Sequence, residues 1–163
     1  MTNVYLTRLD SPIGRIELVG DDDALTGVTI ERDGALPHDG EPERSNAVLD
    51  DARSQLLEYF AGARTDFDVP VRLSGTAFQQ AVWAELERLQ WGEAISYGAL
   101  ATAVGKPGSA RAIGGAVGAN PVPIIVGCHR VLASDGRITG YSGGDGIPTK
   151  LWLLGHERIG FAA

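Results

Sequence analysis

Residues 120–144, NPVPIIVGCHRVLASDGRITGYSGG, hold the only cysteine of the chain, Cys128, with His129 directly after it. The two prolines near the start of this stretch prevent a helix and direct the chain into an extended apolar run at 124–126. A glycine-rich segment with one tyrosine follows at 136–144. The single thiol is therefore expected between a buried strand and a loop that permits close approach of another molecule.

Cys128 has two interpretations. A single cysteine after apolar residues is most often a small buried hydrophobic residue. As a nucleophile it needs activation, because a thiol with an ordinary pKa of about 8.5 is only a few per cent ionised at neutral pH. His129 is the nearest base, although in an extended segment the two side chains point to opposite faces, so the pair needs a local turn or a bridging water. His156 is a second candidate base, and Glu157 can orient His129 as the acid of a Cys–His–acid relay.

The composition is that of a globular protein with one domain or two small lobes. The chain has 163 residues, of which 44% are hydrophobic and 21% are charged, and these values exclude a disordered chain. It has no apolar run near the roughly 20 residues of a membrane helix and no secretory signal. One cysteine cannot form an internal disulfide, and no Cys/His cluster has zinc-finger spacing. We expect a cytoplasmic protein without a metal and without membrane contact.

The net charge of −7 comes from the first half of the chain. Residues 1–76 contain 7 Arg and no Lys against 15 Asp and Glu, a net charge of −8. Residues 77–163 contain 7 Lys and Arg against 6 acidic residues, a net charge of +1. An acidic chain argues against nucleic acid as a partner, but the second half alone can face an anion.

The first half predicts a small β-sheet lobe with a helix. Short β-rich runs separated by turn residues predict strands at 4–9, 14–20 and 24–30. A polar segment rich in Gly and Pro predicts an exposed loop at 31–46, and 67–71 predicts a strand or extended linker. A helix is expected from residue 47 to Gly62, with an inward face made of Val48, Leu49, Leu56, Leu57 and Phe60. The domain boundary is expected near 70–76, which gives an acidic structural domain over 1–75 and a second domain over 76–163.

The second half predicts helices. Thr76 and Gln79 have the spacing of a capping box. The helix that follows carries Phe78, Val82, Leu86 and Leu89 and stops at Trp91-Gly92. Ser96 and Ser109 are expected to cap two short helices, 97–104 and 110–119, joined by a Gly/Pro turn as in a helix-turn-helix.

A last helix is expected at 148–160, with Pro148 in its first turn and Leu151, Leu154 and Ile159 inward. The predicted fold class is therefore α+β. A small N-terminal β-sheet lobe with a helix precedes an all-α-rich C-terminal domain that contains a helix-turn-helix and an active-site loop.

Three glycines interrupt the helix expected at 110–119: Gly114, Gly115 and Gly118. Each costs about 0.5–1 kcal/mol relative to alanine in a helix. Such a helix either brings its backbone close to a large flat partner or packs closely against a neighbouring helix. On this feature alone the two alternatives are nearly equal.

Four motifs together resemble the O6-alkylguanine-DNA alkyltransferases, also called methylated-DNA–protein-cysteine methyltransferases. They are ISYGALA, RAIGGAVGAN, WLLGHE and the 25-residue stretch quoted above, and they occur with compatible order and spacing over residues 76–157. The first lobe is similar only in architecture. The resemblance implies DNA repair by direct reversal, in which the alkyl group of O6-alkylguanine moves irreversibly to the protein's own cysteine in a single turnover. O4-methylthymine is a second candidate substrate.

The resemblance also implies double-stranded DNA containing O6-alkylguanine as the partner, and no cofactor or metal. The damaged nucleotide has to be flipped, because O6 of guanine lies inside the duplex. Residues 76–163 are then the DNA-binding and alkyl-acceptor domain. The implied state is a monomer, for which cooperative assembly on DNA stays open.

The motifs assign a role to each matched residue. Cys128 is the alkyl acceptor, His129 deprotonates it through a bridging water, and Glu157 orients His129. Asn120 is a hinge that ties the recognition helix to the active-site loop. Tyr97 helps to rotate the phosphate and donates toward guanine N3.

The implied DNA contacts lie on the helix-turn-helix, with Arg111 as the finger that fills the gap left by the flipped base. The DNA-binding set is Arg111, Tyr97, Ser109, Ala110, Gly114 and Gly115. The substrate pocket implied by the resemblance is Pro123, Val131, Tyr141, Ser142 and Val117. In it Pro123 is a wall, Val131 offers a backbone contact to the exocyclic amine, Tyr141 is an aromatic lid, and Ser142 supplies a backbone donor toward O6.

Two positions depart from the family pattern. Gly127 stands where the family usually has proline, which leaves more backbone freedom before Cys128. Gly118 stands where some members carry an arginine, so one phosphate contact is missing. Some relatives bind zinc through cysteines of the first lobe, and this lobe contains no cysteine.

Three rival functions are open from the sequence. An alkyltransferase-like protein binds the flipped base but lacks the cysteine, so Cys128 argues against it. A cysteine hydrolase using Cys128 and His129 requires an oxyanion hole and a water path, and the sequence demands neither. A helix-turn-helix regulator suits the second short helix poorly, because this helix is almost bare of long polar side chains.

Overall fold

A three-stranded antiparallel sheet forms the N-terminal part of this computed structural model, which describes residues 3–162. Its strands are β1 (Tyr5–Leu9), β2 (Ile16–Gly20) and β3 (Leu25–Ile30), in the order β1-β2-β3. All three lie where the alternation and turn residues predict them. Gly14, with φ of +104°, supplies the left-handed conformation that the turn between β1 and β2 requires.

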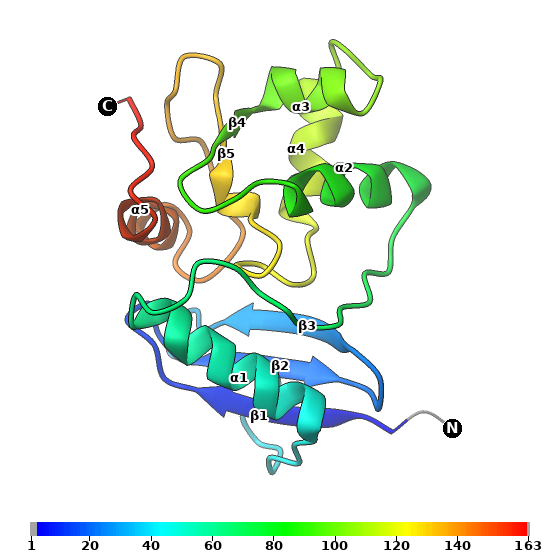
Figure 1. The fold of residues 1–163 in the computed structure, drawn as a ribbon, viewed down its shortest axis with the longest axis vertical. Coiled ribbons are helices and arrows are strands. Elements are labelled where there is room, and N and C mark those ends of the chain that lie inside the picture. Colours follow the sequence, from blue (N-terminus) through cyan, green and yellow to red (C-terminus); the bar gives the residue numbers. More distant parts are fainter. Residues whose placement is uncertain (1–2, 163) are drawn as a thin grey trace.

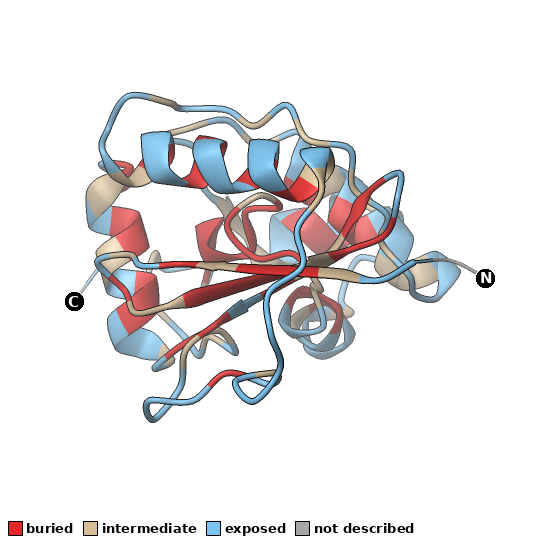
Figure 2. Ribbon diagram, turned by 90° about the horizontal axis from the view of Figure 1, so that it is seen from below, coloured by how far each residue is buried: buried red, intermediate tan, exposed pale blue. Residues whose placement is uncertain are grey.

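Helix α1 (Ala47–Phe60) packs along one face of this sheet, as Figures 1 and 2 show. The Asn46 side chain accepts a hydrogen bond from the Leu49 backbone N–H and caps the start. Gly62, with φ of +78°, ends it in the predicted place. The predicted inward face is partly wrong: Leu57 is exposed, and the buried residues are Leu49, Ala52, Gln55, Leu56 and Tyr59.

The Gln55 side chain points inward because it forms hydrogen bonds with the backbone of Asp68. Its amide donates to the Asp68 carbonyl at 3.0 Å and accepts from the Asp68 N–H at 2.8 Å. Both backbone groups of an extended linker are thereby satisfied without water. A polar residue therefore lies on the buried stripe of α1, and the hydrophobic pattern alone does not reveal that stripe.

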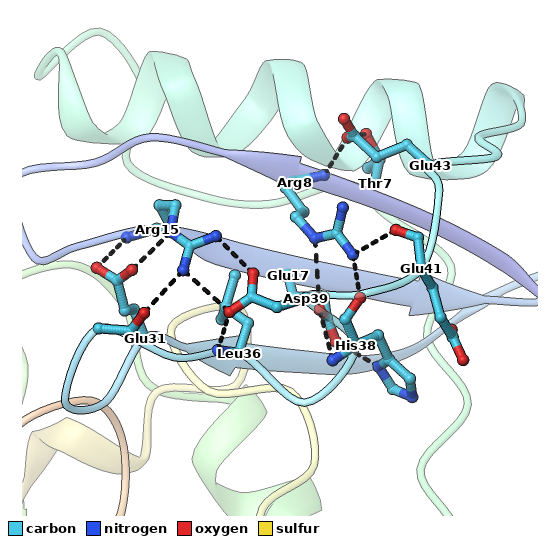
Figure 3. A network of polar contacts seen from close by, with 11 residues as sticks. Thr7, Arg8, Arg15, Glu17, Glu31, Leu36, His38, Asp39, Glu41 and Glu43 are labelled. Carbon is cyan, nitrogen blue, oxygen red and sulfur yellow. Dashed lines mark hydrogen bonds and ion pairs between the residues drawn. The ribbon is translucent and has the colours of Figure 1, made fainter.

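The opposite face of the sheet is covered by the loop 31–46, and polar side chains hold it there (Figure 3). Arg15 contacts Glu31 at 2.5 Å and Asp39 at 2.6 Å. Glu17, which is 1% exposed, accepts from His38 Nδ1 at 2.5 Å. The loop is mostly exposed, as predicted, but these contacts make it an ordered cover of the sheet.

The C-terminal half is mainly helical (Figure 1). Its elements are α2 (Ala77–Glu87), β4 (Ile95–Ser96), α3 (Tyr97–Ala103), α4 (Ala110–Gly118), the 3₁₀ turn η1 (Cys128–Arg130), β5 (Val131–Leu132) and α5 (Ile147–His156). The predicted capping box of Thr76 and Gln79 is present, and Ser96 caps α3. The buried Trp83 of α2 donates its indole N–H to the Ala116 carbonyl of α4 at 2.8 Å. The α+β class predicted from the sequence is confirmed.

One element of this half was not predicted, and two local predictions are wrong. The short strands β4 and β5 pair in parallel, a contact between distant residues that no local pattern indicates. Ser109 occupies the N-cap position of α4, but its hydroxyl donates to the Lys106 carbonyl, so it makes no cap hydrogen bond. Leu151 is 38% exposed, because Lys150 takes the inward position in that turn of α5.

The two halves meet along β3 and the ends of α1 and α5. The Val28 N–H donates to the Pro121 carbonyl at 2.9 Å, so the edge strand of the sheet binds the stretch that leads to the cysteine. Phe60 of α1 and Trp152 of α5 pack with ring centroids 5.7 Å apart. Among residues 3–162, no helix has the length and apolar character needed to cross a membrane.

Candidate active site

Cys128 opens the η1 turn and is 3% exposed. The turn is the local bend that the adjacent Cys128 and His129 require if they are to act on one proton. Asn120 holds the segment before it, donating to the Val126 carbonyl at 2.8 Å and accepting from the Val122 N–H at 3.0 Å. Because these bonds close the loop on both sides, the approach to the thiol is well ordered although residue 127 is a glycine.

The thiol faces a cavity of about 240 Å³. Its lining residues are Tyr97, Gly114, Val117, Gly118, Cys128, Gly140, Tyr141 and Ser142. The Tyr141 hydroxyl lies 4.0 Å from the sulfur. The structure therefore brings residues from α3, α4, the η1 turn and the loop 136–144 around one sulfur atom.

The resting thiol is protonated. Burial raises the pKa of Cys128 above its ordinary value, and interactions with Asn120, Tyr141 and Lys150 offset this only in part. The sulfur consequently needs a base at the moment of reaction.

His129 is the base that the structure provides. It is fully buried, and burial lowers its pKa, so the ring is neutral at pH 7 and can take up a proton. Its Nε2 lies 2.7 Å from Glu157 Oε2. Burial alone would raise the pKa of Glu157, but hydrogen bonds from His129 and Arg130 and the positive charge of Arg130 lower it to about 2.

An ionised Glu157 fixes the tautomer of His129. A carboxylate only accepts hydrogen bonds, so Nε2 carries the proton and Nδ1 holds a lone pair. Nδ1 is buried and has no hydrogen-bond partner within the part of the chain that the structure describes. The arrangement can therefore take a proton on the imidazole nitrogen that Glu157 does not use.

Two predicted pocket residues do not line this cavity. Pro123 is buried and borders a neighbouring hollow of about 330 Å³, together with Val28 and Asn120. Val131 is buried within the fold, and its carbonyl accepts from the Lys150 ammonium at 2.7 Å. Tyr141, Ser142 and Val117 do lie at the cavity, as do Tyr97 and Gly114.

Of the predicted DNA-binding residues, Tyr97 and Gly114 line the cavity and are half-buried, as is Ser109, whereas Ala110, Arg111 and Gly115 are exposed on α4. Arg111 and Ala110 are exposed in the first turn of α4, and Arg111 makes no hydrogen bond or ion pair with any described residue. Gly115 is also exposed, and no described atom outside its own helix backbone lies within 4 Å of the place where a Cβ would stand. Close packing against another helix therefore does not explain Gly115.

Three charged or polar residues of the site were not predicted from the sequence: Arg130, Lys150 and Tyr59. Arg130 follows the Cys-His pair, and its Nε donates to Glu157 Oε1 at 2.7 Å. Lys150 lies three residues before the buried Leu153 of α5, so its position on an apolar stripe was a usable signal. Tyr59 had no such signal, because its partner Glu157 is 98 residues away.

Among the described residues, no three His, Cys, Asp or Glu side chains gather in a way that could hold a metal ion. The side chains gathered at this site are a thiol, a neutral imidazole, a buried carboxylate and two buried basic side chains.

Two sequence models of known families match the chain. The 6-O-methylguanine DNA methyltransferase, DNA binding domain, matches residues 77–159. The 6-O-methylguanine DNA methyltransferase, ribonuclease-like domain, matches residues 4–73.

Characterised relatives are similar over nearly their whole length. The methylated-DNA–protein-cysteine methyltransferase of Mycobacterium tuberculosis is 44% identical over 160 residues, which are 95% of this chain and 93% of the relative. That of Haemophilus influenzae is 37% identical over 161 residues, 98% of this chain and 89% of the relative.

Solved structures have the same fold. The crystal structure of the M. tuberculosis O6-methylguanine methyltransferase superposes with a TM-score of 0.84 at 42% identity, covering 96% of this chain and 93% of the other. The structure of the M. tuberculosis protein in complex with DNA superposes with a TM-score of 0.82 at 44% identity, covering 93% and 91%.

Proposed function

The chain belongs to the 6-O-methylguanine DNA methyltransferase family, and we propose that Cys128 is the residue that accepts the alkyl group. The protein repairs DNA by alkyl transfer to cysteine, with the activity of a methylated-DNA–protein-cysteine methyltransferase, and DNA is its partner. The resemblance drawn from the four motifs is confirmed. The observation that carries the assignment of Cys128 is its position, as the chain's single thiol, between the cavity and the His129–Glu157 pair.

The proposed reaction transfers the alkyl group from O6 of guanine to the sulfur of Cys128. His129 takes the thiol proton on Nδ1 through a water molecule, and the sulfur attacks the alkyl carbon. The S–C bond forms as the O6–C bond breaks, and its electron pair stays on guanine, which takes up a proton. Buried Glu157 stabilises the imidazolium that forms, because the charge pair is held in a low dielectric.

Tyr97 fits the proposed role of donor to the leaving guanine. The Thr139 hydroxyl donates to the Tyr97 oxygen at 3.0 Å, so the phenolic proton of Tyr97 remains available for another acceptor. The ring borders the cavity beside Gly114. A proton donated to guanine N3 would make the base a better leaving group.

We further propose that O6-alkylguanine in duplex DNA is the substrate, and that it reaches Cys128 as a flipped nucleotide. The buried sulfur lines the cavity that α4 borders. A base inside the stack cannot enter such a cavity. The proposed DNA-binding surface consists of α3 and α4. We expect backbone groups and Arg111 to contact the DNA there, rather than a basic patch.

Four finer points of organisation stay predictions. They are a structural domain over 1–75, a DNA-binding and alkyl-acceptor domain over 76–163, a monomer in solution and a cytoplasmic location. O4-methylthymine stays a second candidate substrate.

The test is a single-turnover labelling experiment. A duplex carrying O6-methylguanine with a radiolabelled methyl group is mixed with the protein, and label is expected on Cys128 at a stoichiometry near one per molecule. Cys128→Ala, with the same fold, is expected to take up none. Label that stays on the DNA contradicts the assignment, and label released to solvent over many turnovers indicates the rival cysteine hydrolase.

A further inference from the structure

Glu157 receives a hydrogen bond from the N-terminal half of the chain. The Tyr59 hydroxyl, near the end of α1, donates to Glu157 Oε2 at 2.5 Å. His129 Nε2 contacts the same oxygen at 2.7 Å. Tyr59, His129 and Glu157 are each 0% exposed, so water does not compete for these bonds. The acidic lobe therefore reaches into the proton relay of the other domain.

Tyr59 is held from several sides. Its ring packs against the rings of Phe67, Trp91 and His156 at centroid distances of 5.4, 5.6 and 5.0 Å. His156 Nε2 also lies 2.7 Å from the Tyr59 carbonyl, which anchors the backbone of α1 to α5. In Figure 1 the end of α1 lies beside α5. A hydroxyl fixed in this way keeps its direction toward Glu157.

A shared oxygen divides its charge between its donors. When Tyr59 donates to Oε2, less of the carboxylate charge acts on the Nε2 proton of His129. We propose, on the basis of the function proposed above, that Tyr59 is a positioning residue for alkyl transfer: it aims Glu157 at His129 and limits the pull of Glu157, so that His129 stays neutral and ready to accept the Cys128 proton.

The charged and titratable groups around His129 support this direction. They are Cys128, Arg130, Lys150 and Glu157. Burial and the positive charges of Arg130 and Lys150 lower the pKa of His129, whereas Glu157 raises it. The hydrogen bond from Tyr59 weakens the effect of Glu157, which is the only group in this set that favours the charged form of the His129 ring. Its loss should therefore raise the pKa of His129.

The experiment compares the pH dependence of single-turnover transfer in the unchanged protein and in Tyr59→Phe. The hydroxyl bonds a charged group, so its loss should move the acidic limb of the rate profile up by about half to one pH unit. On the acidic limb, at pH values below the pKa of His129, the rate at a given pH should then fall about three- to tenfold, while the plateau at high pH stays. A uniform change at every pH, or no change, overturns the proposal.

Tyr5→Phe is the matched control. The Tyr5 hydroxyl also donates to a carboxylate, Asp22, at 2.7 Å, but Tyr5 is on β1, Asp22 is in the turn between β2 and β3, and this bond is exposed. Its removal is the same chemical change away from the relay, and the pH profile should stay where it is. A shift of equal size in Tyr5→Phe overturns the role of Tyr59.

A second measurement distinguishes failure of the role proposed for Tyr59 from failure of the proposed function. The pH dependence of Cys128 alkylation by iodoacetamide, without DNA, should show the same upward shift in Tyr59→Phe. If the unchanged protein fails to take label from DNA but this shift is present, the proposed function fails and the role of Tyr59 stands.

If Tyr59→Phe does not fold, 3-fluorotyrosine placed at position 59 alone gives the opposite test. Its more acidic phenol is a stronger donor of nearly equal size, so the acidic limb should move down. A profile that stays in place contradicts the proposal.

Discussion

At the scale of single residues, the buried and the exposed basic side chains of the site differ in their partners. Arg130 and Lys150 are 6% and 1% exposed and bond Glu157 and the Val131 carbonyl. Each lies in the interior with a partner, as a buried charge requires. Arg111 is exposed and binds no described residue. An arginine that serves neither the core nor an ion pair is available for an external partner.

The finger role of Arg111 is tested by comparing two substrates. If Arg111 fills the gap left by the flipped nucleotide, Arg111→Ala should slow transfer from duplex DNA by about tenfold or more, because unstacking a base costs a few kcal/mol. Transfer from a free O6-alkylguanine base should change little. Single-turnover rates on both substrates measure this.

Arg88→Ala is the control for charge. Arg88 is exposed after the end of α2 and pairs only with Glu85, at 3.3 Å. Its removal lowers the charge by the same amount outside α4, and both rates should stay near those of the unchanged protein. Equal slowing of Arg111→Ala on the two substrates counts against the finger.

At the scale of elements, the glycines of α4 lower the stability of the helix and leave its backbone exposed. Gly115→Ala should raise the free energy of unfolding by about 0.5–1 kcal/mol, because alanine is a better helix former and no described atom blocks the new methyl group. The same methyl group should keep the DNA backbone away and weaken DNA binding several-fold. Urea denaturation and a DNA titration at one fixed salt concentration measure the two effects.

Gly155→Ala is the matched replacement on α5. Gly155 is also exposed and helical, and no described atom lies within 4 Å of its missing Cβ. This variant should gain stability without losing DNA affinity. If Gly115→Ala gains stability and binds DNA as tightly as Gly155→Ala does, the glycines of α4 have no role in DNA binding.

The elements that the sequence predicts correctly are those decided within a few residues. The capping box of Thr76 and Gln79, the Ser96 cap and the stop at Gly62 each depend on hydrogen bonds or dihedral angles over three or four positions. The β4–β5 pair and the inward turns of Gln55 and Lys150 depend on partners 13 or more residues away. Local patterns do not contain such partners.

The candidate site shows the same difference between features decided by neighbouring residues and features decided by distant ones. Cys128, His129 and Glu157 lie in recognisable motifs, and the structure brings His129 and Glu157 together as expected. Tyr59 lies in an ordinary amphipathic helix, where a tyrosine on the inward face looks like any core residue. Its polar role depends on how the two halves dock, which a single sequence does not display.

At the scale of the whole molecule, the two halves share one buried charge network. Tyr59 of the first half and His129 and Arg130 of the second half all bond Glu157. Separation of the halves would leave a buried carboxylate short of a donor, which is costly. The network therefore makes docking of the two halves part of forming the proton relay.

This network should make the fold sensitive to acid. Burial lowers the pKa of His129 in the folded protein below its ordinary 6.5, whereas the unfolded chain takes up a proton near 6.5. Unfolding then binds a proton, so the free energy of unfolding should fall as pH drops below 6.5, by up to about 1.4 kcal/mol per pH unit. Glu157, with its pKa lowered to about 2, adds a further loss as pH falls from about 4.5 toward 2.

Two histidine variants separate this effect from other titrations. His129→Gln keeps a donor for Glu157 but does not titrate, so its free energy of unfolding should depend less steeply on pH between 7 and 5, by at most the slope of about one bound proton. His38 has the opposite sign: its bond to Glu17 raises its pKa, and the stability it contributes is present below 6.5 and lost as pH rises through the raised value. His38→Gln should therefore steepen the loss toward acid. Urea denaturation at pH 7.5, 6.5 and 5.5 measures all three slopes, and equal slopes for His129→Gln and the unchanged protein would show that folding does not lower the pKa of His129.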